Sequence, residues 1–168
     1  MKKIGLLSDT HGHLDPKVFE YFEKCDEIWH AGDIGSTDVS DELSKFKIFR
    51  AVSGNIDGQT IRMIHPEDQI FFCEEVKILI THIGGYPGNY FPEERKKIID
   101  YKPDLFICGH SHILKVMRDT KYNLLHINPG AAGKSGFHKI KTIVRFEING
   151  KRIENLEVIE LGLRASIE

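Results

Sequence analysis

The sequence predicts an α/β protein in which two β-sheets pack face to face and helices cover their outer sides. Residues 1–112 alternate short apolar runs with helical patterns, which is typical of strands connected by helices. After His112, strand patterns follow one another without helices between them. The chain has 168 residues, of which 40% are hydrophobic, so we expect a single domain spanning residues 1–168 with a substantial core.

The apolar runs of the first part predict six strands. They lie at residues 4–8, 27–31, 47–53, 69–73, 76–81 and 104–108. We expect residues 69–73 and 76–81 to form a hairpin, although Glu74-Glu75 is an unusual turn sequence. The remaining runs are separated by helical patterns, so we expect a mainly parallel sheet.

Three helices are predicted between these strands. The first has Asp15 as N-cap and Pro16 at its first helical position, and its apolar face carries Val18, Phe19 and Phe22. The second covers residues 39–45. The third runs from residue 92 to residue 101, with Glu93 and Glu94 in its first turn, and Pro103 ends it.

The last third predicts strands at residues 113–119, 124–128, 139–148 and 151–161. The sequence Asn149-Gly150 is a strong hairpin turn between the final two strands. Alternation in residues 140–148 predicts one apolar face and one polar face. Ile140, Val144, Phe146 and Ile148 form the first face, and Lys141, Arg145 and Glu147 the second.

Composition excludes several classes of protein. The net charge is −2, so the sequence lacks the basic excess of a protein that binds long nucleic acids. No apolar run approaches the roughly 20 residues of a membrane-spanning helix, and the run Ile4–Leu7 is too short for a signal peptide. We therefore expect a cytoplasmic protein. Its three cysteines (Cys25, Cys73 and Cys108) are expected to be buried rather than disulfide-bonded.

Five polar clusters directly follow predicted strands. They are Asp9-Thr10-His11, Gly32-Asp33, Gly54-Asn55, Thr81-His82 and Gly109-His110-Ser111-His112. Asp9, Asp33, Asn55, His82 and His110 are separated by 24, 22, 27 and 28 residues, each about one strand plus its return connection. Successive strands of a mainly parallel sheet would place all five clusters at one edge, where α/β proteins bind ligands.

These clusters contain two carboxylates, four imidazoles and one carboxamide, a donor set that suits first-row divalent metals. Seven donors exceed what one ion needs, so we expect two ions. Two dications about 4 Å apart repel by about 17 kcal/mol at an effective dielectric of 20, and a bridging carboxylate and hydroxide would offset this repulsion. Such a site retains positive charge and should attract an anionic substrate such as a phosphate ester.

The motifs resemble those of calcineurin-like metallophosphoesterases, in the family's order. They are Asp9-x-His11, Gly32-Asp33, Gly54-Asn55-x-Asp57, His82 and Gly109-His110-x-His112. The compact length and Asn128-Pro129-Gly130 resemble the small bacterial and archaeal phosphodiesterase branch, to which the eukaryotic retromer subunit of this fold also belongs. The resemblance covers about residues 4–160 and implies a four-layer αββα sandwich.

The resemblance also implies roles for individual residues. Asp9, His11 and His112 would bind the first metal, Asp33 would bridge, and Asn55, His82 and His110 would bind the second. A hydroxide bridging the metals would attack phosphorus in line, which makes Asp33, Asn55 and His82 the expected catalytic residues. Mn²⁺ is the first expectation, with Ni²⁺, Co²⁺, Fe²⁺ or Zn²⁺ as alternatives, because such a ligand set does not override metal availability.

One position departs from the family pattern. Many members have histidine after the Gly-Asn pair, where it can protonate the leaving group, and this chain has Ile56. A general acid typically contributes 10²–10⁴ in rate, so without one we expect substrates with good leaving groups to react best. We expect a phosphodiesterase rather than a phosphomonoesterase. The alternatives are a catalytically weak metal-binding scaffold for protein partners and a nuclease acting on dinucleotides or cyclic nucleotides.

Several other residues carry two interpretations each. Tyr86, in the glycine-rich loop after His82, could contact a substrate ring or lie on a flexible surface loop, and His13 is a weaker substrate-binding candidate. His30 could support a ligand or belong to the core, and Asp57 could orient a ligand or only form a turn. The edge of the final hairpin could mediate a homo-oligomer.

Overall fold

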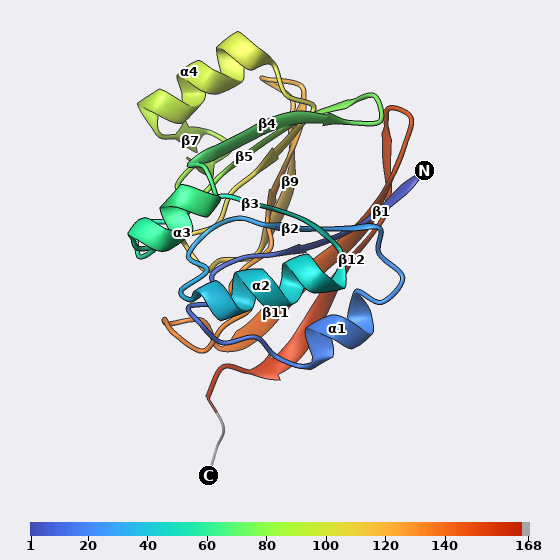
Figure 1. Ribbon diagram of the computed structural model, residues 1–168. Coiled ribbons are helices and arrows are strands. Elements are labelled where there is room, and N and C mark those ends of the chain that lie inside the picture. Colours follow the sequence, from blue (N-terminus) through green and yellow to red (C-terminus); the bar gives the residue numbers. More distant parts are fainter. Residues whose placement is uncertain (166–168) are drawn as a thin grey trace.

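The computed structural model describes residues 1–165 and contains two five-stranded sheets (Figure 1). The first sheet has the order β12 (Arg152–Leu163), β11 (Ile140–Asn149), β1 (Lys2–Leu7), β2 (Glu27–His30) and β3 (Ile48–Ala51). The second has the order β4 (Asp68–Cys73), β5 (Val76–Thr81), β8 (Leu105–Ile107), β10 (Leu124–Asn128) and β9 (Lys115–Asp119). A short ribbon pairs β6 (Gly85–Tyr86) with β7 (Asn89–Tyr90).

Each sheet has three parallel strands at its centre. In the first sheet β1, β2 and β3 are mutually parallel, and in the second β8 is parallel to both β5 and β10. The expectation that one mainly parallel sheet carries all five polar clusters is therefore wrong. The strands of the last third also do not form a sheet of their own, since β11 pairs with β1 and β10 pairs with β8.

Three apolar clusters define the predicted four layers. The central one lies between the sheets and combines Ile4, Leu6 and Trp29 with Ile78 and Ile107. A second cluster packs the opposite side of the first sheet against helices, and a third does the same for the second sheet. Strand alternation produces this division, because Ile28 and Leu79 face the helices while their neighbours Trp29 and Ile78 face the other sheet.

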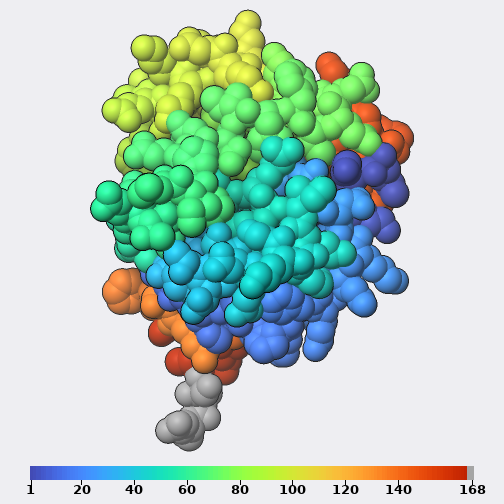
Figure 2. Space-filling model, viewed as in Figure 1, coloured from blue at the N-terminus to red at the C-terminus, as the bar shows by residue number. Residues whose placement is uncertain are grey.

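Four helices within residues 1–165 occupy the outer layers. They are α1 (Lys17–Tyr21), α2 (Thr37–Phe46), α3 (Gln59–Ile64) and α4 (Pro92–Tyr101). Val18, Val39 and Ile61 place α1, α2 and α3 on the first sheet, and Ile98 places α4 on the second. In Figures 1 and 2, α1 and α2 cover the lower part of the molecule and α4 covers the top.

The helix predictions succeed where an apolar face or a stop signal is present. The third predicted helix has the observed bounds of α4, and Lys102 ends it in the left-handed conformation. Helix α1 begins one residue later than predicted, at Lys17, whose backbone amide donates to Asp15 Oδ1. Helix α3 was not predicted, because a six-residue helix that buries only Ile61 has no readable apolar stripe.

The alternation in β11 is partly correct. Val144, Phe146 and Ile148 face the second sheet as predicted. The placement of Ile140 on that core face is wrong, because its side chain is 39% exposed and the strand register shifts at Lys141. Lys141 is itself buried, since its Nζ lies 2.7 Å from Asp15 Oδ2.

The expectations for the hairpins and for the cysteines agree with the structure. Both predicted hairpins are present, β4–β5 and β11–β12. Cys25, Cys73 and Cys108 are buried free thiols. Within residues 1–165, every helix is too short or too polar to span a bilayer.

Candidate metal centre

The predicted ligands lie immediately beyond the carboxyl ends of strands from both sheets. Asp9 and His11 follow β1, Asp33 follows β2, Asn55 follows β3, His82 follows β5, and His110 and His112 follow β8. Backbone bonds tie these loops together within each sheet, including Asp9 N to Gly32 O at 3.0 Å and Gly109 N to His82 O at 2.9 Å. The His110 amide donates to Asp9 Oδ2 at 3.1 Å and so connects the two sheets at the site.

Six of the seven predicted ligands form two groups that could each hold a metal ion. One group is Asp9, His11 and His112, and the other is Asp33, His82 and His110. Within each group, one ligand atom from every residue lies within 4.8 Å of the others. The groups adjoin each other, because His11 Nε2 is 3.4 Å from Asp33 Oδ2 and His82 Nε2 is 3.8 Å from Asp9 Oδ1.

Both carboxylates use one oxygen to hold the loops and turn the other toward the histidines. Asp9 Oδ2 accepts from Ser8 Oγ at 2.6 Å, while Asp9 Oδ1 has no hydrogen-bond donor and lies 3.2 Å from His112 Nε2. Asp33 Oδ1 accepts from the Ile56 amide at 3.0 Å, while Asp33 Oδ2 lies 3.2 Å from His82 Nε2. The free oxygens therefore lie where the two groups meet.

The chemistry of these donors fits divalent cations. His82 Nδ1 donates to the Ala31 carbonyl at 2.7 Å, which leaves Nε2 as the nitrogen with a free lone pair. Asp9 Oδ1, His11 Nε2 and His82 Nε2 are buried and have no hydrogen-bond partner. Buried polar atoms are almost always paired, so three unpaired ones together need a ligand such as a cation.

Asn55 lies beside the second group. Its Oδ1 is 3.0 Å from His110 Nδ1, and its side chain is exposed at the end of the loop after β3. This position places a carboxamide next to the group formed by Asp33, His82 and His110. Its role as a ligand stays a prediction.

The charges in the cluster stabilise one another. Burial opposes ionisation of Asp9, but the nearby imidazoles of His11, His112 and His82 outweigh it and hold the pKa of that carboxyl far below its usual value. The neighbouring Asp9 carboxylate raises the pKa of His11. Burial lowers the pKa of His110, and the neighbouring His82 lowers it further. The carboxylates are thus ionised at neutral pH, as metal ligands must be.

The backbone at this site is unusual. Five of the seven predicted ligands have a positive φ, between 47° and 67°: Asp9, His11, Asp33, His110 and His112. This conformation is uncommon for residues other than glycine and concentrates at functional sites. Glycine is also required at position 54, because a Cβ there would overlap Asp33 Oδ1. The loops therefore adopt unfavourable backbone conformations where they bring the predicted ligands together.

Asp57 is a positioning residue that joins two ligand loops. Its Oδ2 accepts from the amides of Ile34 at 3.1 Å and Gly54 at 2.8 Å, and its Oδ1 accepts from Gly35 at 2.9 Å. Of the two interpretations offered by the sequence, the structure supports a role in orienting the ligand loops through their backbone amides. Asp57 itself belongs to neither ligand group.

His30 and Asn128 support the site in a similar way. His30 is fully buried, accepts from the Gly32 amide through Nδ1 and pairs with Thr10 Oγ1 through Nε2. Burial lowers its pKa to about 4, so it is a neutral member of the core. Asn128 donates to the Gly109 carbonyl at 3.0 Å and thereby holds the loop that carries His110. Only the resemblance pointed to Asn128, and no sequence signal pointed to Ser8, which donates to Asp9.

The two weaker substrate-binding candidates differ in position. Tyr86 is 47% exposed and lines a cavity together with His110. His13 belongs to neither ligand group, and burial lowers its pKa. His138 packs its ring edge-on against His112 with the centroids 5.2 Å apart.

Comparison with known proteins decides the family. Residues 1–151 match the model of the calcineurin-like phosphoesterase superfamily domain. The chain belongs to this superfamily. The two ligand groups therefore lie in a phosphoesterase fold, and the family implies that divalent ions bind there.

Similar proteins agree with this assignment. A phosphodiesterase of Methanocaldococcus jannaschii is 32% identical over 144 residues, which cover 76% of this chain and 82% of that protein. The structure of an archaeal phosphodiesterase is 27% identical, covers 95% of this chain and 99% of its own, and superposes with a TM-score of 0.75. Vps29 of Chaetomium thermophilum superposes with a TM-score of 0.76 over 96% of this chain and 97% of its own, but its 16% identity shows a common fold only.

In this member of the superfamily, the position after the Gly-Asn pair contributes only its backbone to the site. The Ile56 amide binds Asp33, while its hydrocarbon side chain is 47% exposed and has no proton to donate. The side chain at position 56 therefore cannot protonate a leaving group, which is the departure from the family pattern that the sequence indicated.

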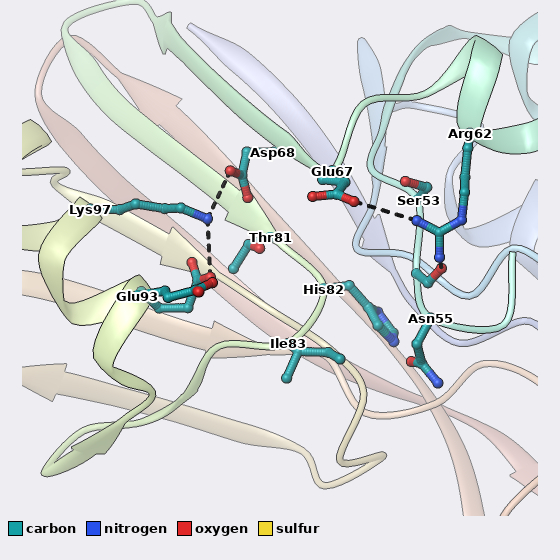
Figure 3. Close-up of a pocket in the computed structure, with 12 residues that line it drawn as sticks. Ser53, Asn55, Arg62, Glu67, Asp68, Thr81, His82, Ile83, Glu93 and Lys97 are labelled. Carbon is teal, nitrogen blue, oxygen red and sulfur yellow. Dashed lines mark hydrogen bonds and ion pairs between the residues drawn. The ribbon is translucent and has the colours of Figure 1, made fainter.

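A polar cavity of about 270 Å³ is lined in part by the predicted ligands Asn55 and His82 (Figure 3). Lys97 extends from α4 on its other side and pairs with Asp68 at 2.9 Å and Glu94 at 3.1 Å. Burial raises the pKa of Glu94. The charged lining suits the hydrophilic part of a ligand.

Proposed function

We propose that the chain is a divalent-metal-dependent phosphodiesterase that holds two ions at adjacent sites. The observation that carries this proposal is the set of buried, unpartnered atoms Asp9 Oδ1, His11 Nε2 and His82 Nε2 where the two ligand groups meet. Asp9, His11 and His112 would hold one ion, and Asn55, His82 and His110 the other, with Asp33 shared between them. Mn²⁺ is the first candidate metal.

When bound, the two ions would supply Lewis-acid activation of water and neutralise charge on the phosphoryl oxygens. The chain's own residues would position this chemistry. Asp33 is held by the Ile56 amide through Oδ1, which leaves Oδ2 at the boundary of the two groups. Asn55 is exposed beside His110 and would contact the phosphate. The name of the related phosphodiesterase supports a diester as the substrate.

The absence of a donor at Ile56 bears on the leaving group. Without a proton donor there, esters with acidic leaving groups such as nitrophenol should react faster than alkyl esters. Because Ile56 supplies no proton donor, we also consider a second candidate function, a catalytically weak scaffold that binds metal and a protein partner. The two candidates differ in whether restored metal also restores turnover.

The test removes metal with a chelator and restores Mn²⁺, Ni²⁺, Co²⁺, Zn²⁺ or Mg²⁺ separately. Hydrolysis of bis-p-nitrophenyl phosphate and of p-nitrophenyl phosphate is then measured beside the melting temperature. We expect at least one metal to raise both the diester rate and the melting temperature. Asp33→Asn and His110→Ala should abolish the rate, while Asp41→Asn, an exposed position on α2, should retain it.

Other results would contradict parts of this proposal. A higher melting temperature without turnover for any metal would favour the scaffold. Faster monoester than diester hydrolysis would contradict the phosphodiesterase assignment. If no metal changes either quantity, the two groups do not form a metal centre.

A further inference from the structure

A second cavity, of about 430 Å³, adjoins the candidate metal centre at His110. Its lining includes four large apolar side chains, Ile83, Tyr86, Phe91 and Ile113, which are between 37% and 64% exposed. Exposed apolar side chains gathered around one cavity indicate a binding site, and this volume is in the range of small-ligand pockets. The cavity has a different character from the polar one beside Asn55, which charged side chains line.

One buried polar side chain in this lining has no partner. His126, on β10, is 1% exposed, and neither of its ring nitrogens makes a hydrogen bond. Its ring packs beside Phe106 and Tyr90, with centroid distances of 5.8 and 6.1 Å. Burial, and secondarily Lys115, lowers its pKa to about 4, so the ring is neutral and offers one donor and one acceptor.

The rim of the cavity carries a positive charge. Lys115 Nζ lies 4.6 Å from the centre of the Tyr86 ring, and both residues line the cavity. A cation at the rim favours a ligand that also carries a phosphate. The Asn128 side chain, which also lines the cavity, is already engaged by hydrogen bonds to Gly109, Ser111 and Gly130.

We propose that this cavity binds a flat heteroaromatic ring of nucleobase size, which is the organic group of the phosphate-ester substrate. The inference rests on the proposed function, because it places the ester's phosphate at the metal centre. His110 belongs both to the second ligand group and to the cavity wall, so one molecule can reach both. Tyr86 and Phe91 supply aromatic surface for stacking, and the neutral ring of His126 forms part of the wall behind them.

The test uses adenosine and ribose as probes on the full chain loaded with Zn²⁺, observed through the backbone amide signals in NMR. Adenosine should shift the signals of residues 84–86 and 111–113, and ribose at the same concentration should not. Phe91→Ala should raise the Kd of adenosine by about fivefold or more, the usual effect of losing one stacking side chain. The matched control is Phe72→Ala, because Phe72 is 57% exposed on β4 and does not line this cavity.

A kinetic measurement connects the cavity to the substrate. Phe91→Ala should raise the KM for bis-p-nitrophenyl phosphate more than it lowers kcat, and Phe72→Ala should change neither. Equal shifts from ribose, or equal weakening by both variants, would overturn the proposal, and metal-dependent hydrolysis by the wild type would then leave the proposed function intact. Adenosine binding without hydrolysis for any metal would contradict the proposed function and the assignment of the cavity to its substrate.

Discussion

Asp57 Oδ2 lies 3.1 Å from the backbone nitrogen of Ile34 and thereby joins the loop after β3 to the loop that carries Asp33. The same carboxylate also accepts the amides of Gly35 and Gly54. One buried side chain thus fixes the relative position of two loops that each supply a predicted ligand. The candidate metal centre depends on such supports because its loops have unfavourable backbone conformations.

Replacing Asp57 with alanine should weaken both the fold and the metal centre. Three backbone amides, two of them in buried hydrogen bonds, would lose a charged acceptor, so we expect the free energy of unfolding to fall by about 3 kcal/mol or more. Metal affinity should fall about 10–100-fold, the usual effect of losing a residue that orients ligands. Urea unfolding and calorimetric metal titration measure these quantities. Asp41→Ala is the control, and an Asp57→Ala protein with wild-type metal affinity would contradict this role.

Ile56→His should introduce the missing proton donor. The backbone bond from residue 56 to Asp33 does not involve the side chain and should persist. The rate on alkyl phosphodiesters should rise by about tenfold or more, while the rate on bis-p-nitrophenyl phosphate should change little, because its leaving group needs no proton. Ile56→Gln provides a polar control without an acidic proton. An equal change on both substrates would count against leaving-group protonation.

The stability of the protein should fall in acid partly through His126. Its folded pKa of about 4 lies below the unfolded value of 6.5, so the unfolded chain binds more protons between these pH values. The contribution is present above pH 6.5 and is lost as the pH falls toward 4, by an amount on the order of 3 kcal/mol. His126→Phe should reduce the difference in unfolding free energy between pH 7 and pH 4.5. An unchanged difference would show that His126 does not titrate as described.

The buried ion pair between Lys141 and Asp15 should contribute more than an exposed pair. The two side chains are 2.7 Å apart, and each is less than 10% exposed as a residue. Lys141→Met leaves the Asp15 charge buried alone and should cost about 3–5 kcal/mol of unfolding free energy. Arg152→Met removes one partner of the exposed Arg152–Glu154 pair and should cost less than about 1 kcal/mol. Similar losses in both variants, measured by urea unfolding, would contradict this difference.

Local patterns were sufficient to predict most strands and to place the candidate ligands at strand ends. Asp9, Asp33 and His82 each follow an apolar strand closely, and a strand end limits where a side chain can lie. Helix α4 was equally readable, because Pro92, acidic residues and Pro103 mark its ends within one short segment. By contrast, α3 has no such local signal.

The division of the polar clusters between two sheets could not be predicted in the same way. The pairing of β1 with β11 joins residues more than 130 positions apart, and the sequence of neither strand indicates which strand it pairs with. The roles of Asp57, His30 and Asn128 could not be decided from the sequence for a related reason. Each one binds backbone amides or carbonyls, which every residue possesses, so their sequence context does not distinguish them.

The sequence by itself determined the α/β class, the strand-end positions of the candidate ligands and the hydrocarbon side chain at Ile56. These properties depend on residue type and short-range periodicity. Only the tertiary structure decided that two sheets share the site, that Asp57 connects its loops, and that His126 lies unpaired in the wall of an apolar cavity beside His110. These depend on contacts between distant segments, which form when strands from different parts of the chain bury their apolar faces together.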